Sequence, residues 1–198
     1  MGKRQLAAQE TRRKIVAAAE KLIREKGFAA VGVADIAAEA GVAKGTFYTY
    51  FERKEDVVAE IAYRRYADIE ARALCSGAVE RQIAAFLRGS MQYIEETGLH
   101  ICQQWLNNSV QPDDTQGKKK LAYDLDVLQS LLRDAVIRGE LCADTPAEAL
   151  TEDIIAAYYG IVTLWSITNG GMDPVDHIER FAEQTLPHIL TPYRINKE

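Results

Sequence analysis

One lysine, two threonines and two tyrosines lie within seven residues, in the stretch KGTFYTY at positions 44–50. Their side chains supply one ammonium group and four hydroxyl groups, all of which can donate hydrogen bonds. Such groups bind phosphate oxygens, and a threonine can also contact a base edge or a thymine methyl group. Glycine lets the backbone approach the duplex closely. We therefore expect this stretch to bind double-stranded DNA through Lys44, Gly45, Thr46, Tyr48, Thr49 and Tyr50.

A short helix would hold these side chains together, and the apolar spacing predicts one. Phe47 and Phe51 are one helical turn apart, so both can face inward while the polar residues face outward. At 1.5 Å per residue, seven residues form a helix roughly 10 Å long. That length fits a major groove about 12 Å wide.

A second short helix is expected directly before the first. Ile36 and Ala40 are one turn apart, and Gly41 can adopt the left-handed conformation that ends a helix. Val42 then leads into the next helix, and a longer helix with apolar residues from 15 to 23 can cover both. Two helices joined in this way form a helix-turn-helix, which places its second helix in the major groove.

Charge is distributed unevenly along the chain. Residues 1–55 contain eleven Lys and Arg against seven Asp and Glu, a net charge of +4, which leaves −9 for the rest of a chain whose total is −5. A basic head on an acidic body suggests that the head meets a polyanion. The alternatives are a solvated basic surface and a helical corner whose tyrosines only cover a core. The helix-turn-helix pattern and the charge together favour DNA.

The remainder of the chain also has helical spacing and no alternating run of strand length. Helices are expected at 53–74, 79–96, 99–108, 118–138, 146–168 and 174–190, with a loop at 111–120. Thr145, Pro146 and Glu148 form the pattern of a capping box at the start of one helix. The predicted fold class is all-α, with about nine helices.

Several classes of protein are disfavoured by what the sequence contains. The N-terminus has no apolar signal region, and the longest nearly apolar run, 154–168, is shorter than the roughly 20 residues of a membrane span. The three cysteines are far apart, which argues against disulfides and a zinc site. The three histidines are scattered and no catalytic motif is present. We expect a cytoplasmic protein that is not an enzyme, without a catalytic site, cofactor, metal or membrane contact.

Residues 11–61 closely resemble the DNA-binding head of the TetR (tetracycline-repressor) family of bacterial transcriptional regulators. The matching residues are Ile15, Ala18-Ala19, Leu22, Gly27-Phe28, Asp35-Ile36-Ala37, Ala40-Gly41-Val42, Lys44-Gly45-Thr46, Tyr48, Tyr50-Phe51 and Lys54-Glu55. The resemblance implies an all-α dimer of nine or ten helices with a divergent ligand-binding body. It also implies that residues 44–50 form the recognition surface and that Lys54 contacts phosphate.

Three positions depart from the family pattern. Members commonly have Ser or Thr where this chain has Gly32, Ala43 and Arg53, just before the second, third and fourth helices. Glycine is a fair N-cap, but alanine costs about 1 kcal/mol relative to serine. The change at Ala43 also removes one possible phosphate contact, whereas Arg53 adds a positive charge.

The sequence thus predicts a three-helix helix-turn-helix domain at 1–55 and an effector-binding and dimerisation domain at 56–198. An apolar cavity with a few polar groups would suit an apolar or aromatic effector. The candidate pocket residues are Phe86, Met91, Tyr93, Trp105, Asn108, Tyr123, Tyr158 and Trp165. The helix at 146–168 is apolar nearly all round and needs cover on every side. The resemblance implies that the last two long helices pair with those of a partner, and the candidate interface residues are Tyr159, Val162, Thr163, Phe181 and Thr185.

Three classes of function are compatible with these patterns. The first is a homodimeric repressor that a small-molecule effector releases from operator DNA. The second is an activator, or a DNA-binding protein without an effector. The third is a helical ligand carrier or an enzyme, for which the sequence offers no supporting group of residues.

Overall fold

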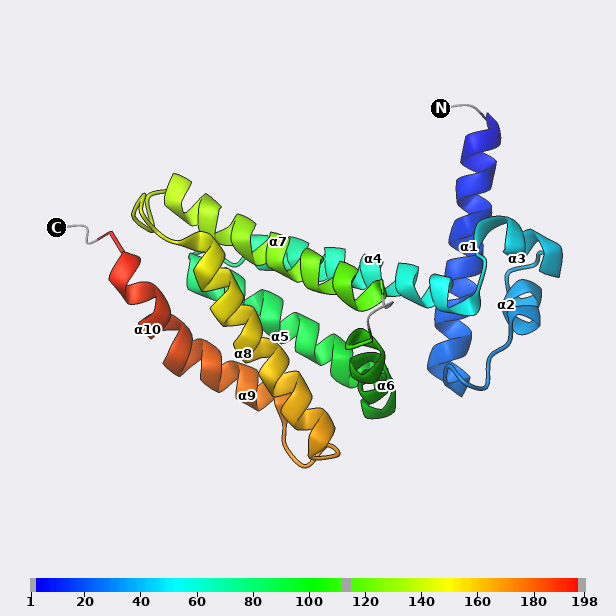
Figure 1. The fold of residues 1–198 in the computed structure, drawn as a ribbon. Coiled ribbons are helices and arrows are strands. Elements are labelled where there is room, and N and C mark those ends of the chain that lie inside the picture. The colour runs from blue at the N-terminus through cyan, green and yellow to red at the C-terminus, as the bar shows by residue number, and fades with distance from the viewer. Residues whose placement is uncertain (1–2, 112–114, 196–198) are drawn as a thin grey trace. The chain divides into compact units, whose positions relative to one another are not determined.

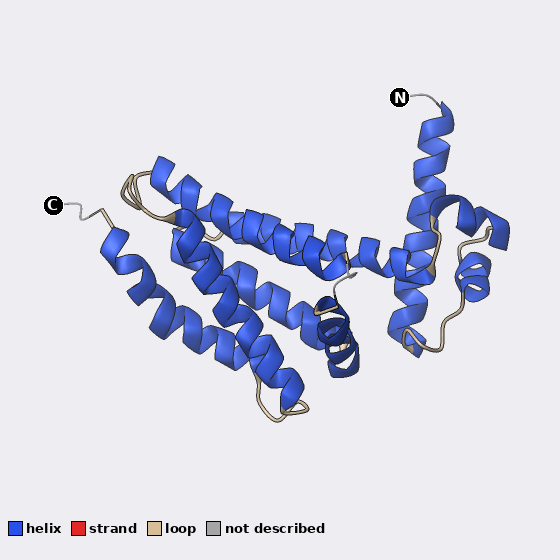
Figure 2. Ribbon diagram, in the orientation of Figure 1, coloured by secondary structure: helices blue, strands red, loops and turns tan. Residues whose placement is uncertain are grey.

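The computed structural model describes residues 3–111 and 115–195, which are almost entirely helical (Figure 2). Within these ranges there is no strand, only one isolated antiparallel bridge between Leu141 and Arg194. The chain divides into two compact units, Met1–Tyr66 and Ala67–Glu198, and each has its own apolar core. The predicted all-α fold class is confirmed. The assignment of DNA binding to residues 1–55, and of effector binding and dimerisation to residues 56–198, stays a prediction.

Unit 1 contains α1 (Lys3–Lys26), α2 (Val33–Glu39), α3 (Lys44–Tyr50) and the first part of α4 (Lys54–Leu74) (Figure 1). Gly41 has a φ of +68°, the left-handed conformation expected between α2 and α3. The centre of the unit is formed by buried residues from all four helices and from the segments between them: Ile15, Val16, Ala18, Ala19, Leu22, Val31, Ile36, Phe47, Phe51 and Val57. The predicted helix-turn-helix is confirmed, and α3 has the predicted bounds.

Unit 2 continues with α5 (Val79–Thr97), α6 (Leu99–Ser109), α7 (Gln116–Ile137) and α8 (Ala147–Ile167). The helix predicted at 174–190 consists of α9 (Pro174–Arg180), one π-helical turn (Phe181–Thr185) and α10 (Leu186–Leu190), followed by a 3-10 turn at Thr191–Tyr193. Helix α5 packs against α7 and α9, and α8 packs against α7, α6 and α9 (Figure 1). These contacts enclose the core of the unit.

The π-helical turn has a cause in the sequence. Pro187 has no backbone N–H, and its ring would clash with the carbonyl four residues earlier in a regular α-helix. Instead, Leu186 N–H donates to the carbonyl of Phe181, five residues back. The helix therefore continues through the proline with one extra residue in that turn.

Two local predictions at the ends of helices are wrong. Thr145 does not cap α8, because its hydroxyl donates to the Cys142 carbonyl at 2.6 Å and Pro146 is the N-cap residue. Glu148 pairs with Arg133 at 3.3 Å instead of completing a capping box. The loop predicted at 111–120 is shorter than expected, since α7 begins at Gln116.

Helix α8 is only partly covered by its own chain. Its inner face, which includes Ile154, Tyr158 and Val162, is buried. On the opposite face Leu164 is 53% exposed and Ile167 is 75% exposed. A strip of apolar surface therefore remains on a helix that the sequence predicts to be covered on every side. Within the described residues, no helix is both long and apolar enough to cross a bilayer.

Candidate nucleic-acid interface and effector site

Helix α3 presents its polar residues to solvent and its phenylalanine to the core. Phe47 is fully buried, whereas Tyr48 is 51% exposed. Of the other predicted DNA-binding residues on this helix, Lys44, Gly45 and Thr49 are exposed, and Thr46 and Tyr50 are half-buried. Gly45 has open space where a Cβ atom would lie. The structure thus brings the donors of residues 44–50 together on one short helix.

Aromatic contacts hold α3 against the rest of unit 1. The ring of Phe47 meets that of Tyr48 edge-on at 5.5 Å and lies 5.7 Å from that of Phe51. The guanidinium of Arg12 lies over the Phe51 ring at 4.7 Å and pairs with Glu60 at 2.6 Å. One side chain of α1 therefore contacts both the residue that follows α3 and a residue of α4.

Carboxylates support the helix starts where the family usually has a hydroxyl. Asp35 accepts a hydrogen bond from Gly32 N–H, and Asp56 accepts one from Arg53 N–H, each at 2.8 Å. These bonds reproduce half of a capping box at α2 and α4. Ala43 provides no side-chain cap to α3. A nearby carboxylate therefore compensates for the missing hydroxyl at Gly32 and at Arg53, whereas no side-chain hydrogen bond caps α3 at Ala43.

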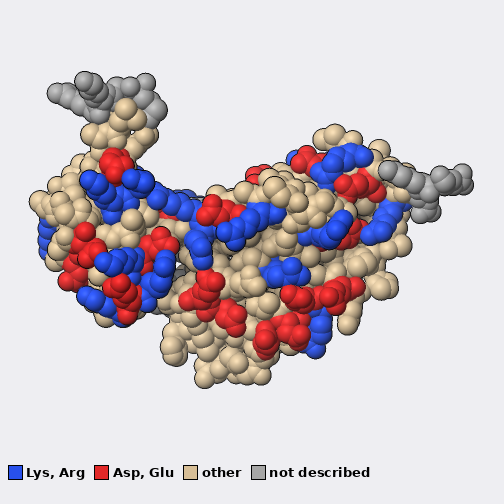
Figure 3. Space-filling view, turned by 180° about the vertical axis from the view of Figure 1, so that it is seen from behind, with Lys and Arg blue, Asp and Glu red and all other residues tan. Residues whose placement is uncertain are grey.

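Helix α2 is tied to α1 by an exposed ion pair. Lys21 Nζ lies 2.6 Å from Glu39 Oε1. The hydrogen bond to Glu39 raises the pKa of the Lys21 ammonium group above its usual value. On the face drawn in Figure 3, Lys and Arg side chains cover much of unit 1 but are interspersed with acidic ones. Some of the basic charge of unit 1 is therefore already paired within the protein.

Lys54 has a set of partners that the sequence did not indicate. Its Nζ donates to the carbonyl oxygens of Phe28 and Val31, each at 2.8 Å, and lies 3.9 Å from the centre of the Phe28 ring. A lysine has three N–H donors, so two are used inside the protein. Lys54 thereby fastens the start of α4 to the loop between α1 and α2. Its contact with phosphate stays a prediction.

The candidate effector residues are distributed over the core and its margin in unit 2. Phe86, Met91, Tyr158 and Trp165 are buried, while Tyr93, Trp105 and Tyr123 are half-buried. The side chain of Asn108 lies outside the described part of the chain. Rings from α6 and α8 meet where Trp105 stacks on Tyr159 with centroids 5.9 Å apart and planes 17° apart. Tyr158 meets Tyr159 edge-on at 5.4 Å.

Next to these rings lies a polar cluster that sequence reasoning missed. The carboxylate of Asp124 is 1% exposed and accepts hydrogen bonds from Lys120 Nζ and, at 2.8 Å, from the hydroxyl of Tyr159. Tyr123 donates its hydroxyl to Glu70 at 2.7 Å. The available signal was the spacing of Lys120 and Asp124, one helical turn apart on α7.

Burial changes the acid–base behaviour of this cluster. The pKa of the Lys120 ammonium is lowered, because desolvation outweighs the opposing effect of Asp124. The pKa of Tyr123 is raised strongly, first by burial and then by its hydrogen bond to the Glu70 carboxylate. The hydroxyl of Tyr123 is therefore protonated at neutral pH.

Comparison with known proteins identifies the helix-turn-helix unit. The sequence profile described as "Bacterial regulatory proteins, tetR family" matches residues 15–61, which run from α1 through α2 and α3 into α4. Residues 15–61 therefore match the DNA-binding part of the TetR family. The predicted resemblance is confirmed.

Two known regulators match this chain over nearly its whole length. It is 27% identical to the HTH-type transcriptional regulator TtgR of Pseudomonas putida, over 93% of this chain and 94% of TtgR. It is 26% identical to the HTH-type transcriptional repressor BepR of Brucella suis, over 95% and 96% of the two chains. The match therefore includes unit 2.

Solved structures show the same fold. A TetR transcriptional regulator from Chloroflexus aurantiacus aligns with a TM-score of 0.63 and 24% identity, over 96% of this chain and 98% of that one. FadR from Bacillus subtilis, in complex with stearoyl-CoA, aligns with a TM-score of 0.61 and 20% identity, over 90% and 97% of the two chains. At these identities the likeness concerns the fold alone.

Two residues proposed for the dimer interface are buried in the core of unit 2. Val162 has no exposed surface and Phe181 is 9% exposed, so both already pack within the chain. Tyr159 is half-buried and directs its hydroxyl to Asp124. Thr163 is half-buried and Thr185 is exposed. Large apolar surface on α8 is instead offered by Leu164 and Ile167.

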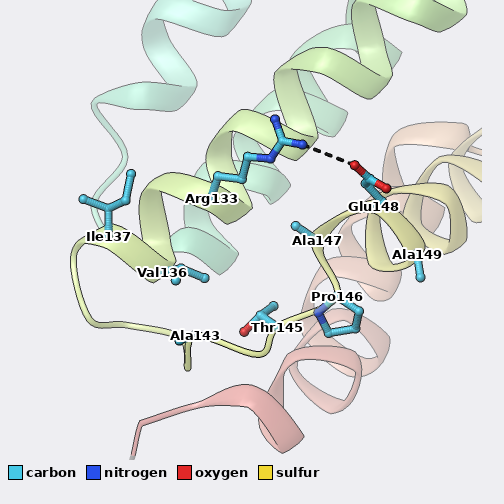
Figure 4. A pocket seen from close by; sticks show the side chains of 9 residues that line it. All are labelled: Arg133, Val136, Ile137, Ala143, Thr145, Pro146, Ala147, Glu148 and Ala149. Carbon is cyan, nitrogen blue, oxygen red and sulfur yellow. Dashed lines mark hydrogen bonds and ion pairs between the residues drawn. The ribbon is translucent and has the colours of Figure 1, made fainter.

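A shallow groove of about 700 Å³ lies between the end of α7 and the start of α8 (Figure 4). Val136 and Ile137 of α7 line it, Pro146 lies on its other side, and Arg133 and Glu148 form an ion pair at its edge. None of the candidate effector residues lines this groove. Among the described residues, no three His, Cys, Asp or Glu side chains gather in a way that could hold a metal ion.

Proposed function

We propose that the protein is a dimeric transcriptional repressor that a small apolar or aromatic effector releases from its operator. The observation that carries the DNA-binding part is the outward polar face of α3, with Tyr48 and Lys44 exposed and Phe47 fixed in the core. A helix of this length can enter the major groove, where Lys44 and the hydroxyl groups reach phosphates and base edges. The TetR-family match at residues 15–61 and the similarity to the transcriptional repressor BepR support repression.

A homodimer would supply the second head that two half-sites, roughly 34–36 Å apart, require. The exposed strip of α8 supports this part of the proposal, since Ala156, Gly160, Leu164 and Ile167 recur at three- and four-residue intervals. In an antiparallel pair of α8 helices, Ala156 of one copy would lie near Gly160 of the other. Small residues at the crossing allow close approach, and Leu164 and Ile167 would then be covered at the two ends.

Helix α4 gives the proposed switch a physical route. It is a continuous helix from Lys54 to Leu74, so it begins in unit 1 and ends in unit 2. An effector lowers operator affinity only if it binds the DNA-incompetent arrangement more tightly. We place the effector near Trp105, in unit 2, and the regulator in the cytoplasm, where the operator is found. No catalytic step belongs to this function.

Retention of operator DNA on a gel tests the proposal directly. Sequences selected from a random pool by the full-length protein should be retained at low salt, and a small-molecule library should contain compounds that abolish retention. Six to ten neutralised phosphates would lower affinity by roughly 10³–10⁵ between 50 and 200 mM salt. A flat salt response would contradict DNA binding through these heads. Retention that no compound alters would favour an effector-independent regulator.

A further inference from the structure

The interior of unit 2 contains a buried cluster of charged side chains. Asp124 is almost completely buried and is held by Lys120 and by the hydroxyl of Tyr159. A second carboxylate, that of Glu70, accepts a hydrogen bond from the hydroxyl of Tyr123, the residue next to Asp124. Buried ions lose hydration, and an apolar cluster of similar size is often at least as stable. The stability of unit 2 alone therefore does not account for this cluster.

Among the described members of the cluster, the negative charges outnumber the positive one. Lys120 contributes one positive charge, whereas Asp124 and Glu70 contribute two negative charges, and the tyrosine hydroxyls are neutral. Asp126, an exposed residue on the same helix, adds a further negative charge that also acts on Tyr123. A positive group entering this place would be stabilised, while a negative group would face two carboxylates.

Aromatic rings adjoin the carboxylate on the side of α6 and α8. The stacked rings of Trp105 and Tyr159 lie beside it, because Tyr159 donates its hydroxyl directly to Asp124. Aromatic faces attract cations, and tryptophan does so most strongly. A carboxylate bordered by such rings fits an organic cation better than a neutral molecule.

Lys120 occupies the position that such a cation would take. It lies near the start of α7, one turn before Asp124, on a long and flexible side chain. Because burial disfavours its charged form, moving the ammonium group into solvent recovers hydration. Asp124, by contrast, lies one turn further into α7 and is bound by two partners.

We propose that this cluster is the polar end of the effector site and that the effector is an organic cation with an aromatic or apolar body. Its ammonium group replaces that of Lys120 on Asp124, and its body packs against Trp105 and Tyr159. The exchange keeps one positive charge beside the buried carboxylate. The inference rests on the proposed effector-released function, and it adds the chemical class of the effector.

Three compounds with the same body and different charges test the class. The probes are 3-phenylpropylamine, 3-phenylpropanol and 3-phenylpropanoate, titrated into the full chain in a calorimeter at neutral pH. The ammonium compound should bind more tightly than the alcohol by roughly tenfold or more, because a charge-assisted hydrogen bond replaces a neutral one. The carboxylate should bind least. A carboxylate that binds as well as the ammonium compound would overturn the proposal.

Substitutions in the cluster test the exchange. Lys120→Met removes the competing ammonium group and should tighten binding of 3-phenylpropylamine by roughly tenfold. Asp124→Asn should weaken it by a similar factor, while the control Asp134→Asn, exposed near the other end of α7, should leave it unchanged. Circular dichroism would confirm that each variant is folded. If Asp124→Asn does not fold, the affinity of Lys120→Met for 3-phenylpropylamine still tests the exchange.

Two outcomes contradict the inference without touching the proposed function. Loss of ammonium binding in Lys120→Met would mean that Lys120 itself is the anchor, as for an anionic ligand. Absence of ammonium binding to both the unaltered chain and Lys120→Met would mean that the cluster only supports the fold. In either case, operator retention and its release by some other compound can persist, since binding to the probes is measured without DNA. Loss of operator retention would refute the proposed function instead.

Discussion

At the scale of single residues, Lys54 and Lys44 should support DNA binding in different ways, Lys54 by holding unit 1 together and Lys44 by contacting DNA. Lys54 donates to two carbonyl oxygens of its own unit, whereas Lys44 is exposed on α3. We expect Lys54→Met to weaken operator binding with little change in its salt dependence, because the loop before α2 loses its anchor. It should also lower the free energy of unfolding by about 1–3 kcal/mol, since buried carbonyls lose their donor.

Lys44→Met is the matched control for this prediction. It should leave stability nearly unchanged and reduce the slope of log affinity against log salt by about 0.9 for each phosphate contact that is lost. The measurement is operator affinity at several salt concentrations, together with denaturant unfolding. A reduced slope for Lys54→Met would show that its remaining N–H does contact phosphate.

Thr46 and Lys44 should contribute differently to the recognition of DNA, Thr46 to base preference and Lys44 to affinity for all sequences. Thr46→Ala should relax the preference for a base at one position of each half-site, because a threonine contacts a base edge or a thymine methyl group. Lys44→Ala should weaken binding to all sequences alike unless the lysine reaches guanine. Selection of bound sequences from a random pool distinguishes the two. If neither variant changed the selected base sequence, the bases would be recognised by another surface of the protein.

Residue roles were predictable from sequence where periodicity alone decides them. The spacing of Phe47 and Phe51 correctly assigned an inner face to α3, and the exposure of Tyr48 follows from it. The partners of Lys54 and Lys120 were not predictable, because they depend on carbonyls and carboxylates that only the folded chain brings near. The pocket and DNA-contact residues themselves stay predictions.

At the scale of elements, α8 offers a matched pair of substitutions. Ile167→Glu places a charge on the exposed apolar strip. We expect this variant to sediment as a folded monomer of 22.1 kDa and the unaltered chain to sediment at twice that mass. Val162→Glu places the same charge in the core and should unfold unit 2, since an unpaired buried charge is strongly destabilising. Sedimentation and circular dichroism check both. A dimeric Ile167→Glu would move the interface elsewhere.

The existence of the helices was predictable, but some of their ends were not. Apolar spacing and Gly41 placed α2 and α3 correctly, because local sequence determines both the helix and its end. At α8, Thr145 has the residue type of a cap, yet its hydroxyl closes a turn onto Cys142. Local pattern could not distinguish these two uses of one hydroxyl group.

At the scale of the whole molecule, operator binding and effector response should be separable. Trp105→Ala changes a half-buried ring of unit 2 and leaves α3 untouched, so operator affinity without effector should be nearly normal. Release by effector should be blunted by part of a coupling of about 1–3 kcal/mol. Operator affinity of both proteins, with and without effector, is the measurement. An unchanged response would place the effector away from Trp105.

The π-helical turn at Phe181–Thr185 makes the last helix sensitive to the number of residues it contains. Before the turn, buried positions recur at Pro174, Ile178 and Phe181, and a regular helix would next bury Thr185. The extra residue moves burial to Leu186 and Leu190 and leaves Thr185 in solvent. Adding one codon within 181–185 would turn α10 by about 100° and take both leucines off the core, because this turn already holds its one extra residue. In this segment, length is therefore under tighter constraint than the identity of its exposed residues.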